Sequence, residues 1–311
     1  MDFKKFTKIV GSLLVLLSFG FLFLLLSKLD FDALKGLFQL SWIPLMIGFS
    51  LLFSFLYLYM AEGWRILLTL ASQTCLDKHV LFVYLKTVIF KYAPGNVFHF
   101  LGRHSLSKSH QLSHQAIAFA NGVEILLQLF AVSFIIMIGS LFFDISLNIG
   151  DYLLLSRTKI LLAFSLLILL VGVVLFKKKY REALVKKEAF FALVRVLLYH
   201  LVFLLGSASI LAGVYYFLLD VPFTFGIFIQ TIFASSIAWL LGFVVPGAPG
   251  GIGIREAILV LLLPTIMMVS KELVLAGALV YRVVTIVGEA LTYFWAKFFE
   301  IKGVHSDEKS R

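Results

Sequence analysis

Two segments of the sequence combine helix-breaking residues with an arginine. Residues 246–256 read Pro-Gly-Ala-Pro-Gly-Gly-Ile-Gly-Ile-Arg-Glu, and residues 94–103 repeat the frame, because Arg103 and Arg255 each follow the proline of a Pro-Gly pair by nine positions. Proline removes a backbone donor and glycine adds backbone freedom, so both segments interrupt the apolar runs that precede them. Within a bilayer, such broken backbone lies inside protein or along a wet cavity.

The second break has the residue types of an anion site. Arg255 and Glu256 begin the next apolar segment, and a helix N-terminus attracts anions through its free N–H groups and dipole. Arginine adds a planar fork that suits phosphate, and glycine lets backbone approach a ligand. We therefore expect a site for a phosphodiester headgroup here, with Arg103, Asn96 and His99 supplying its second half. The alternative is an interfacial Arg–Glu pair at a structural turn.

Three further charges lie well inside apolar runs, at Glu124, Arg282 and Glu289. A charge at the bilayer centre costs about 2.5–3.5 kcal/mol on insertion scales, so these side chains should face the protein interior and meet partners. They serve as buried ion pairs that locate helices, as parts of a headgroup site, or as both. The expected substrate-binding set is Asn96, His99, Arg103, Glu124, Arg255, Glu256 and Arg282, and the breaks are shaped by Pro94, Gly95, Pro246, Gly247, Pro249, Gly250, Gly251 and Gly253.

The composition indicates an all-α polytopic membrane protein. The 311 residues are 61% hydrophobic and 14% charged, and the mean hydropathy is +1.02. Several apolar runs approach the ~20 residues that span a bilayer. The single cysteine, Cys75, excludes an intramolecular disulfide and a cysteine-based metal cluster. Much of the net charge of +10 lies at the ends of expected spans, which indicates topology and anionic-lipid contact and not nucleic-acid binding.

The chain is expected to form one integral membrane domain, 1–311, with about seven full spans. These start near residues 9, 42, 116, 160, 189, 223 and 273. Two shorter helices are re-entrant or broken: residues 80–92, which end near Lys91, and a segment from 254 that stops or kinks at Pro264. The paired breaks favour an internal repeat with halves 42–176 and 189–299, a pattern typical of transporter binding sites.

The distribution of basic residues predicts a cytoplasmic N-terminus. Lys4, Lys5 and Lys8 precede the first apolar run, and residues 177–187 form the strongest basic loop. With four spans between the breaks, both breaks lie on the cytoplasmic side, whereas a count that differs by one places them on opposite faces. The side of the C-terminus stays open for the same reason. The polar tail, residues 305–311, is expected to be disordered.

Three other polar groups have plainer interpretations. Glu62 and Arg65 are three residues apart on one helix face, which predicts an interfacial ion pair with Trp64 as an anchor. His110 and His114 have a helical spacing that a metal could use, but no cysteine or carboxylate lies nearby, so interfacial polar residues are the favoured interpretation.

Both broken segments together resemble the flippase-like transmembrane domain of lysylphosphatidylglycerol synthases, over essentially the whole chain. The resemblance implies a multi-pass inner-membrane protein linked to lipid translocation, with Arg255, Glu256 and Arg282 as functional positions. Glu124 lies where family members tend to have a Glu-Arg pair, and Ile125 replaces that arginine here. The chain stops soon after Phe299, so we expect it to lack the aminoacyl-transferase domain and not to make the aminoacylated lipid itself.

These observations favour a lipid flippase or transporter that binds an anionic phospholipid or a polyprenyl-phosphate-linked lipid. The arginines would hold the phosphate, and Glu124 and Glu256 would balance their charge. The alternative is a non-transporting accessory subunit that presents a lipid to a separate glycosyl- or aminoacyl-transferase of envelope biosynthesis. An enzyme is not expected, because the sequence has no nucleophile-elbow, zinc-protease or phosphate-loop motif. No cofactor or metal is expected either.

Overall fold

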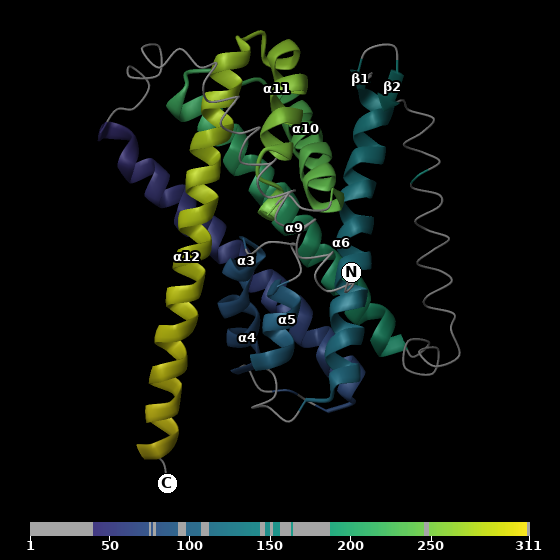
Figure 1. The fold of residues 1–311 in the computed structure, drawn as a ribbon, viewed down its shortest axis with the longest axis vertical. Helices are drawn as coiled ribbons and strands as arrows, with labels where there is room; N and C mark the ends of the chain where they lie inside the picture. The colour runs from purple at the N-terminus through teal and green to yellow at the C-terminus, as the bar shows by residue number, and fades with distance from the viewer. Residues whose placement is uncertain are drawn as a thin grey trace, which may run out of the picture.

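The computed structural model describes residues 40–74, 76, 79–92, 98–106, 112–143, 147–149, 152–155, 163, 187–245 and 249–309. Long helices dominate this part of the chain (Figure 1). They are α3 (Ile43–Ser72), which follows the short turn η1 (Leu40–Trp42), α6 (His114–Phe142), α9 (Lys187–Leu218), α10 (Phe225–Val244) and α12 (Lys271–Lys309). One antiparallel pair, β1 (Leu147–Ile149) and β2 (Tyr152–Leu155), stands beside them.

The five long helices are long and apolar enough to cross a membrane. The spanning stretches are Leu40–Ser72, His114–Phe142, Lys187–Leu218, Phe225–Val244 and Lys271–Phe299. The chain is thus an all-α, multi-pass membrane protein. The predicted spans that start near residues 9 and 160 fall largely outside the described residues, so the total of seven stays a prediction.

Two shorter helical hairpins complete the bundle. The first joins α4 (His79–Thr87) and η2 (Val88–Tyr92) to α5 (Phe98–Leu106), and the second joins α10 to η4 (Pro249–Gly251) and α11 (Ile254–Met267). The first lies in the lower half of Figure 1 and the second in the upper half, and η2 contacts η4 where they meet. The hairpins therefore approach from opposite ends of the bundle, one of the two arrangements that the sequence left open.

Local signals in the sequence fix several helix ends. The Ser113 hydroxyl accepts a hydrogen bond from the Ala116 N–H at 3.1 Å and begins α6, and Thr224 begins α10 in the same way through the Ile227 N–H. Such caps satisfy N–H groups that have no partner inside the helix. At the C-terminal end of α11, Met268 adopts a left-handed backbone conformation and terminates the helix.

The sequence predicted that the second short helix stops or kinks at Pro264, and the structure excludes the stop, because α11 continues through this proline to Met267. A second predicted boundary, at the C-terminus, was wrong. The polar tail was expected to be disordered from residue 305, but α12 continues to Lys309. The tail has no proline or glycine after Gly303, so the helix that contains the last span continues without a break.

Close backbone approach holds α3 against α12. A Cβ atom at Gly288 of α12 would lie 2.7 Å from the Ser50 carbonyl oxygen of α3. Small residues commonly permit such contacts between helices in membranes, where dispersion replaces the hydrophobic effect as the driving force. The buried side chains Phe53 and Tyr57 of α3 continue this interface.

This contact predicts that Gly288→Ala destabilises the fold. Alanine normally favours a helix over glycine, but here its methyl group meets backbone that cannot move aside, and overpacking typically costs about 1–3 kcal/mol. The thermal midpoint of the purified protein in detergent should fall. Gly48→Ala in α3 is the control, because no atom lies within 4 Å of its Cβ position. Equal midpoints for the two variants would contradict this account of the packing.

Candidate functional site

The short helices η2 and η4, which flank the two chain breaks, meet at the candidate site. Gly250, Gly251 and Gly253 have φ angles of +60°, +74° and +85°, which disfavour residues with a Cβ atom. A Cβ atom at Gly250 would lie 2.9 Å from the ring of Tyr92 in η2, so the two segments touch. The predicted motif residues Pro94, Gly95, Asn96, Pro246 and Gly247 lie outside the described residues, and of Pro249 only its place in η4 is described.

Arg103 of α5 is held by a dense set of partners. Its guanidinium donates to the Glu124 carboxylate of α6 and, at 3.2 Å, to the Asn121 side-chain oxygen. It also lies 3.9 Å from the ring centre of Tyr84, whose hydroxyl donates to Glu124 at 2.8 Å. Both charged side chains are 4% exposed. This pair therefore joins the first hairpin to a long helix and leaves Arg103 little freedom to turn toward a ligand.

Trp64 belongs to the same cluster, and its prediction as an interfacial anchor was wrong. It is fully buried, and its indole N–H donates to Asn121 at 2.8 Å. The neighbouring pair was predicted correctly, since Arg65 donates to Glu62 at 2.7 Å and 2.5 Å through two nitrogens.

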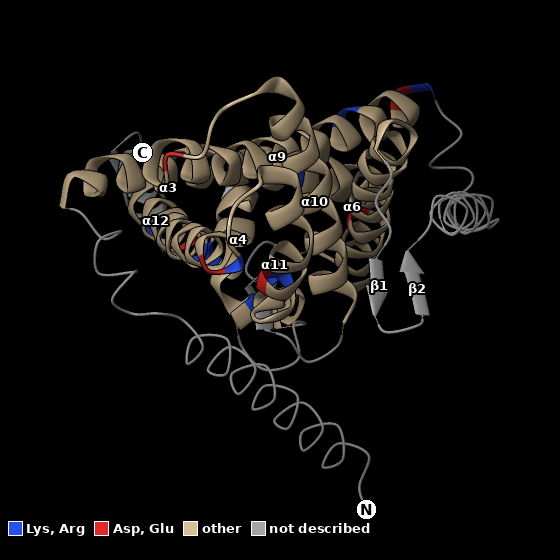
Figure 2. Ribbon diagram, turned by 90° about the horizontal axis from the view of Figure 1, so that it is seen from above, with Lys and Arg blue, Asp and Glu red and all other residues tan. Residues whose placement is uncertain are grey.

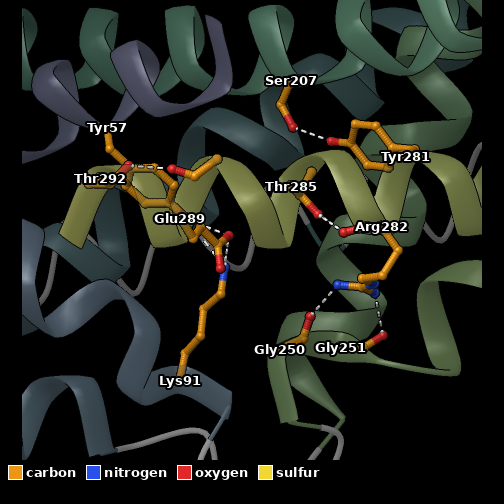
Figure 3. A network of polar contacts seen from close by, with 11 residues as sticks. Tyr57, Lys91, Ser207, Gly250, Gly251, Tyr281, Arg282, Thr285, Glu289 and Thr292 are labelled. Atoms are coloured by element: carbon orange, nitrogen blue, oxygen red, sulfur yellow. Dashed lines mark hydrogen bonds and ion pairs between the residues drawn. The ribbon is translucent and has the colours of Figure 1, made fainter. Parts of the chain in front are cut away.

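Arg282 of α12 ties the second break to the longest helix. Its guanidinium donates to Glu256 at 2.7 Å. It also donates to the carbonyl oxygens of Gly250 and Gly251 at 3.2 Å and 3.4 Å (Figure 3). The same Glu256 accepts the Gly253 N–H at 2.7 Å. The Glu256 carboxylate thus caps α11. It occupies part of the helix N-terminus at which the sequence predicted that an external anion binds.

A third ion pair joins Lys91 of η2 to Glu289 of α12 at 2.5 Å. The Tyr57 hydroxyl of α3 donates to the same carboxylate oxygen at 3.0 Å. Figure 3 shows that Arg282 and Glu289, the partner of Lys91, point to the same side of α12. Lys91 was not among the site residues predicted from the sequence. Its signal was a lysine three residues before Pro94, together with an intramembrane Glu289 that needed a partner.

Arg255 differs from these three cations. Among the described residues no carboxylate forms an ion pair with it, and its buried Nε has no hydrogen-bond acceptor. Its side chain lies between two glycines, since a Cβ atom at Gly242 or Gly251 would fall 2.6 Å from an Arg255 atom. Trp239 offers the face of its ring at 5.6 Å. The glycines therefore make room for an arginine that has no acidic partner in the described part of the chain.

Arg255 shares one cavity of about 90 Å³ with Arg103 and Lys91. Roughly 10–15 Å³ holds one water, so several waters or a small polar group fit. The cavity is lined by Phe53, Tyr57, Met60, Tyr84, Val88, Lys91, His99, Phe100, Arg103, Glu124, Gln128, Phe203, Ser207, Trp239, Phe243, Gly250 and Arg255. Arg282 and Glu256 line a smaller adjoining hollow of about 20 Å³ with Arg255. The predicted residues that the structure describes are thus arranged around Arg255.

Seen from above, the helices are mostly uncharged, and charged residues inside the bundle lie near α4, α11 and α12 (Figure 2). Among the described residues, three carboxylates face Lys91, Arg103, Arg255 and Arg282, and they belong to Glu124, Glu256 and Glu289. One positive charge is therefore unmatched within this cluster. Such an excess in a low-dielectric cavity attracts an anion strongly.

His99 adds a neutral group to the cavity. It lies on α5, which is not one of the five spanning helices, and burial, with the charges of Arg103 and Lys91, lowers its pKa to about 2. The uncharged imidazole keeps a buried Nδ1 without a partner. It is therefore placed for a hydrogen bond to a ligand or water and not for charge neutralisation.

No group of three metal-ligating side chains occurs among the described residues. His110 lies outside them, and His114 instead contacts His104, with the two rings stacked at 4.2 Å between centres. Comparison of the chain with family models, with curated proteins and with solved structures finds no match.

The Arg103–Glu124 pair predicts an asymmetric response to mutation. Arg103→Met should lower the free energy of unfolding by about 3–5 kcal/mol, because it leaves a buried carboxylate without its cation. The double variant Arg103→Met/Glu124→Leu should recover most of that loss, since no charge stays buried alone. Denaturant unfolding in detergent measures both. A single variant as stable as the wild type would mean that the pair does not anchor α5.

Proposed function

We propose that this protein binds the phosphate-bearing headgroup of a membrane lipid in the central cavity and moves it across the bilayer. The phosphate is held between Arg255 and Lys91, and the lipid chains stay among the apolar surfaces of the bundle. This is the transporter that the sequence predicts, with Lys91 added to its binding residues.

The observation that carries the proposal is the unmatched cation Arg255. A buried charge without a partner is costly, and proteins seldom keep one without a use. Within the described part of the chain, three buried polar atoms without a hydrogen-bond partner belong to side chains lining the cavity: His99 Nδ1, Arg103 Nε and Arg255 Nε. Buried polar atoms are nearly always hydrogen-bonded, so their gathering here favours a bound polar group.

The contacts also divide the cations by role. Arg103 and Arg282 each bind a carboxylate and further acceptors, so they position α5 and the second break. Arg255 has no acidic partner among the described residues, and Lys91 has a flexible stem that can turn between partners. We assign direct contact with phosphate to Arg255 and Lys91, with His99 as a neutral hydrogen-bonding group.

The arrangement of the hairpins supports movement as well as binding. They enter from opposite ends of the bundle and meet at η2 and η4 (Figure 1), and residues of both hairpins line the cavity. Transporters with paired broken helices work by shifting one unit against the other around a fixed central site. Tilting of one hairpin against the other would open the cavity toward each leaflet in turn.

The shared chemistry of the ligand is a phosphate on an apolar anchor. Phe53, Met60, Val88 and Phe203 add apolar surface to the lining of the cavity beside its charges. A glycerophospholipid and a polyprenyl-phosphate-linked lipid both meet this description. Residence in a bacterial inner membrane is a further part of the proposal and follows from the family resemblance. Cooperation with an envelope-biosynthesis transferase belongs to the alternative, in which the protein presents a lipid as an accessory subunit.

A translocation assay tests the proposal. Proteoliposomes that contain the purified protein should move fluorescent phosphatidylglycerol, or a fluorescent polyprenyl phosphate in a parallel arm, to the leaflet where dithionite reduces the dye. Arg255→Gln should slow translocation of whichever lipid the wild type moves by about tenfold or more, the change expected for one lost charged contact. The lipid that the wild type moves shows whether the natural substrate has a glycerol or a polyprenyl anchor.

Arg195→Gln is the matched control. It removes the same charge from an exposed position on α9 away from the cavity, so it should translocate lipid like the wild type. Equal rates for wild type and Arg255→Gln would contradict the proposed site. Binding of lipid without translocation would instead support the accessory subunit that presents lipid to a transferase.

A further inference from the structure

Glu289 has a place in the site that charge balance alone does not explain. It lies in the central part of α12 and is 1% exposed. Its Oε1 accepts from Lys91 at 2.5 Å and from Tyr57 at 3.0 Å, while its buried Oε2 has no hydrogen-bond partner among the described residues. The carboxylate therefore depends on one cation, and that cation also lines the ligand cavity.

We infer that binding of the lipid phosphate at Lys91 is coupled to uptake of one proton by Glu289. This inference rests on the proposed function. The phosphate and the carboxylate then share one ammonium group, and two anions at one buried site do not both stay charged. The carboxylate takes the proton, because a phosphodiester is a much stronger acid than a carboxylic acid.

The geometry gives the proton a specific place. Oε2 has no partner, so an O–H bond can form there while Oε1 keeps its hydrogen bond from Tyr57. The proton comes from the solvent: a bond to hydrogen breaks in hydronium or a buffer acid as the O–H bond of Glu289 forms. Lys91 is then free to turn its charge toward the phosphate beside Arg255. In the empty site Glu289 acts as an internal anion that competes with the ligand.

No other described group is placed to neutralise Glu289 once Lys91 binds the phosphate. The titratable and charged groups that face Glu289 are Tyr57 from α3, Lys91 and Tyr92 from η2, and Tyr281 and Arg282 from two turns earlier on α12. The tyrosines carry no positive charge, and Arg282 is bound to Glu256 of α11. Removal of Lys91 by the ligand therefore leaves Glu289 without a cation of its own.

Coupling of this kind would make a proton gradient the energy source for lipid movement. A proton enters the site with each phosphate and leaves with it, so the more acidic side of the membrane loads the site more readily. The sequence left the energy source open, since it has no phosphate-loop motif for nucleotide binding.

Calorimetry on the full chain in detergent tests the inference. Dihexanoyl phosphatidylglycerol is the probe, because its phosphodiester keeps one charge across neutral pH and every proton counted must come to the protein. Titrations at pH 7 in two buffers with different ionisation enthalpies give the number of protons taken up. We expect about one proton per probe for the wild type, and for Glu289→Gln about zero, with about tenfold tighter binding.

Thr292→Val is the matched control, because it removes the Ser54–Thr292 hydrogen bond one turn from Glu289 and leaves the acid in place. It should take up one proton, as the wild type does. Wild-type binding without proton uptake, or unchanged uptake in Glu289→Gln, overturns this inference alone. No binding of the probe by the wild type overturns the proposed function as well. The wild-type proton count decides the matter even if a variant fails to fold.

Discussion

Charge matching in a low-dielectric interior is the constraint on which the rest of this structure depends. A lone ion buried in such a medium is so unfavourable that it must find a counter-charge or lose its own. Three carboxylates inside the bundle find cations on a different structural element in each case, joining α5 to α6, α12 to α11 and η2 to α12. The ion pairs therefore set where the two broken hairpins lie relative to the long helices.

The same constraint makes the absence of an acidic partner for Arg255 in the described part of the chain significant. Packing alone does not require an arginine between two glycines at a chain break, since an apolar side chain would fill that space at a lower electrostatic cost. Its presence beside a cavity, with paired cations around it, favours an anionic ligand as the missing partner. The lysine and the glutamate next to it then form an exchangeable pair, while the two other arginines hold the cavity walls.

Much of the fold followed from the sequence, for physical reasons that can be named. Apolar runs of about membrane length predicted the spans that the structure describes, and intramembrane Glu124 and Arg282 predicted buried partners that the structure supplies. Other features needed three dimensions. Lys91 looked like the end of a short helix until Glu289 was placed beside it. Trp64 resembled an interfacial anchor because a sequence does not show that Asn121 lies opposite. The opposite approach of the hairpins depends on a count of crossings that apolar length alone does not settle.

The most direct measurement of the central claim is the contact between Arg255 and lipid phosphorus. Solid-state NMR with ¹⁵N-labelled arginine and natural ³¹P in lipid bilayers reports guanidinium nitrogens that lie next to phosphorus through dipolar dephasing. The account predicts one dephased arginine component in the wild type, beyond the dephasing of arginines at span ends, that is lost in Arg255→Gln and kept in Arg195→Gln. Identical dephasing in the wild type and Arg255→Gln would show that Arg255 does not hold a phosphate, and would contradict the account.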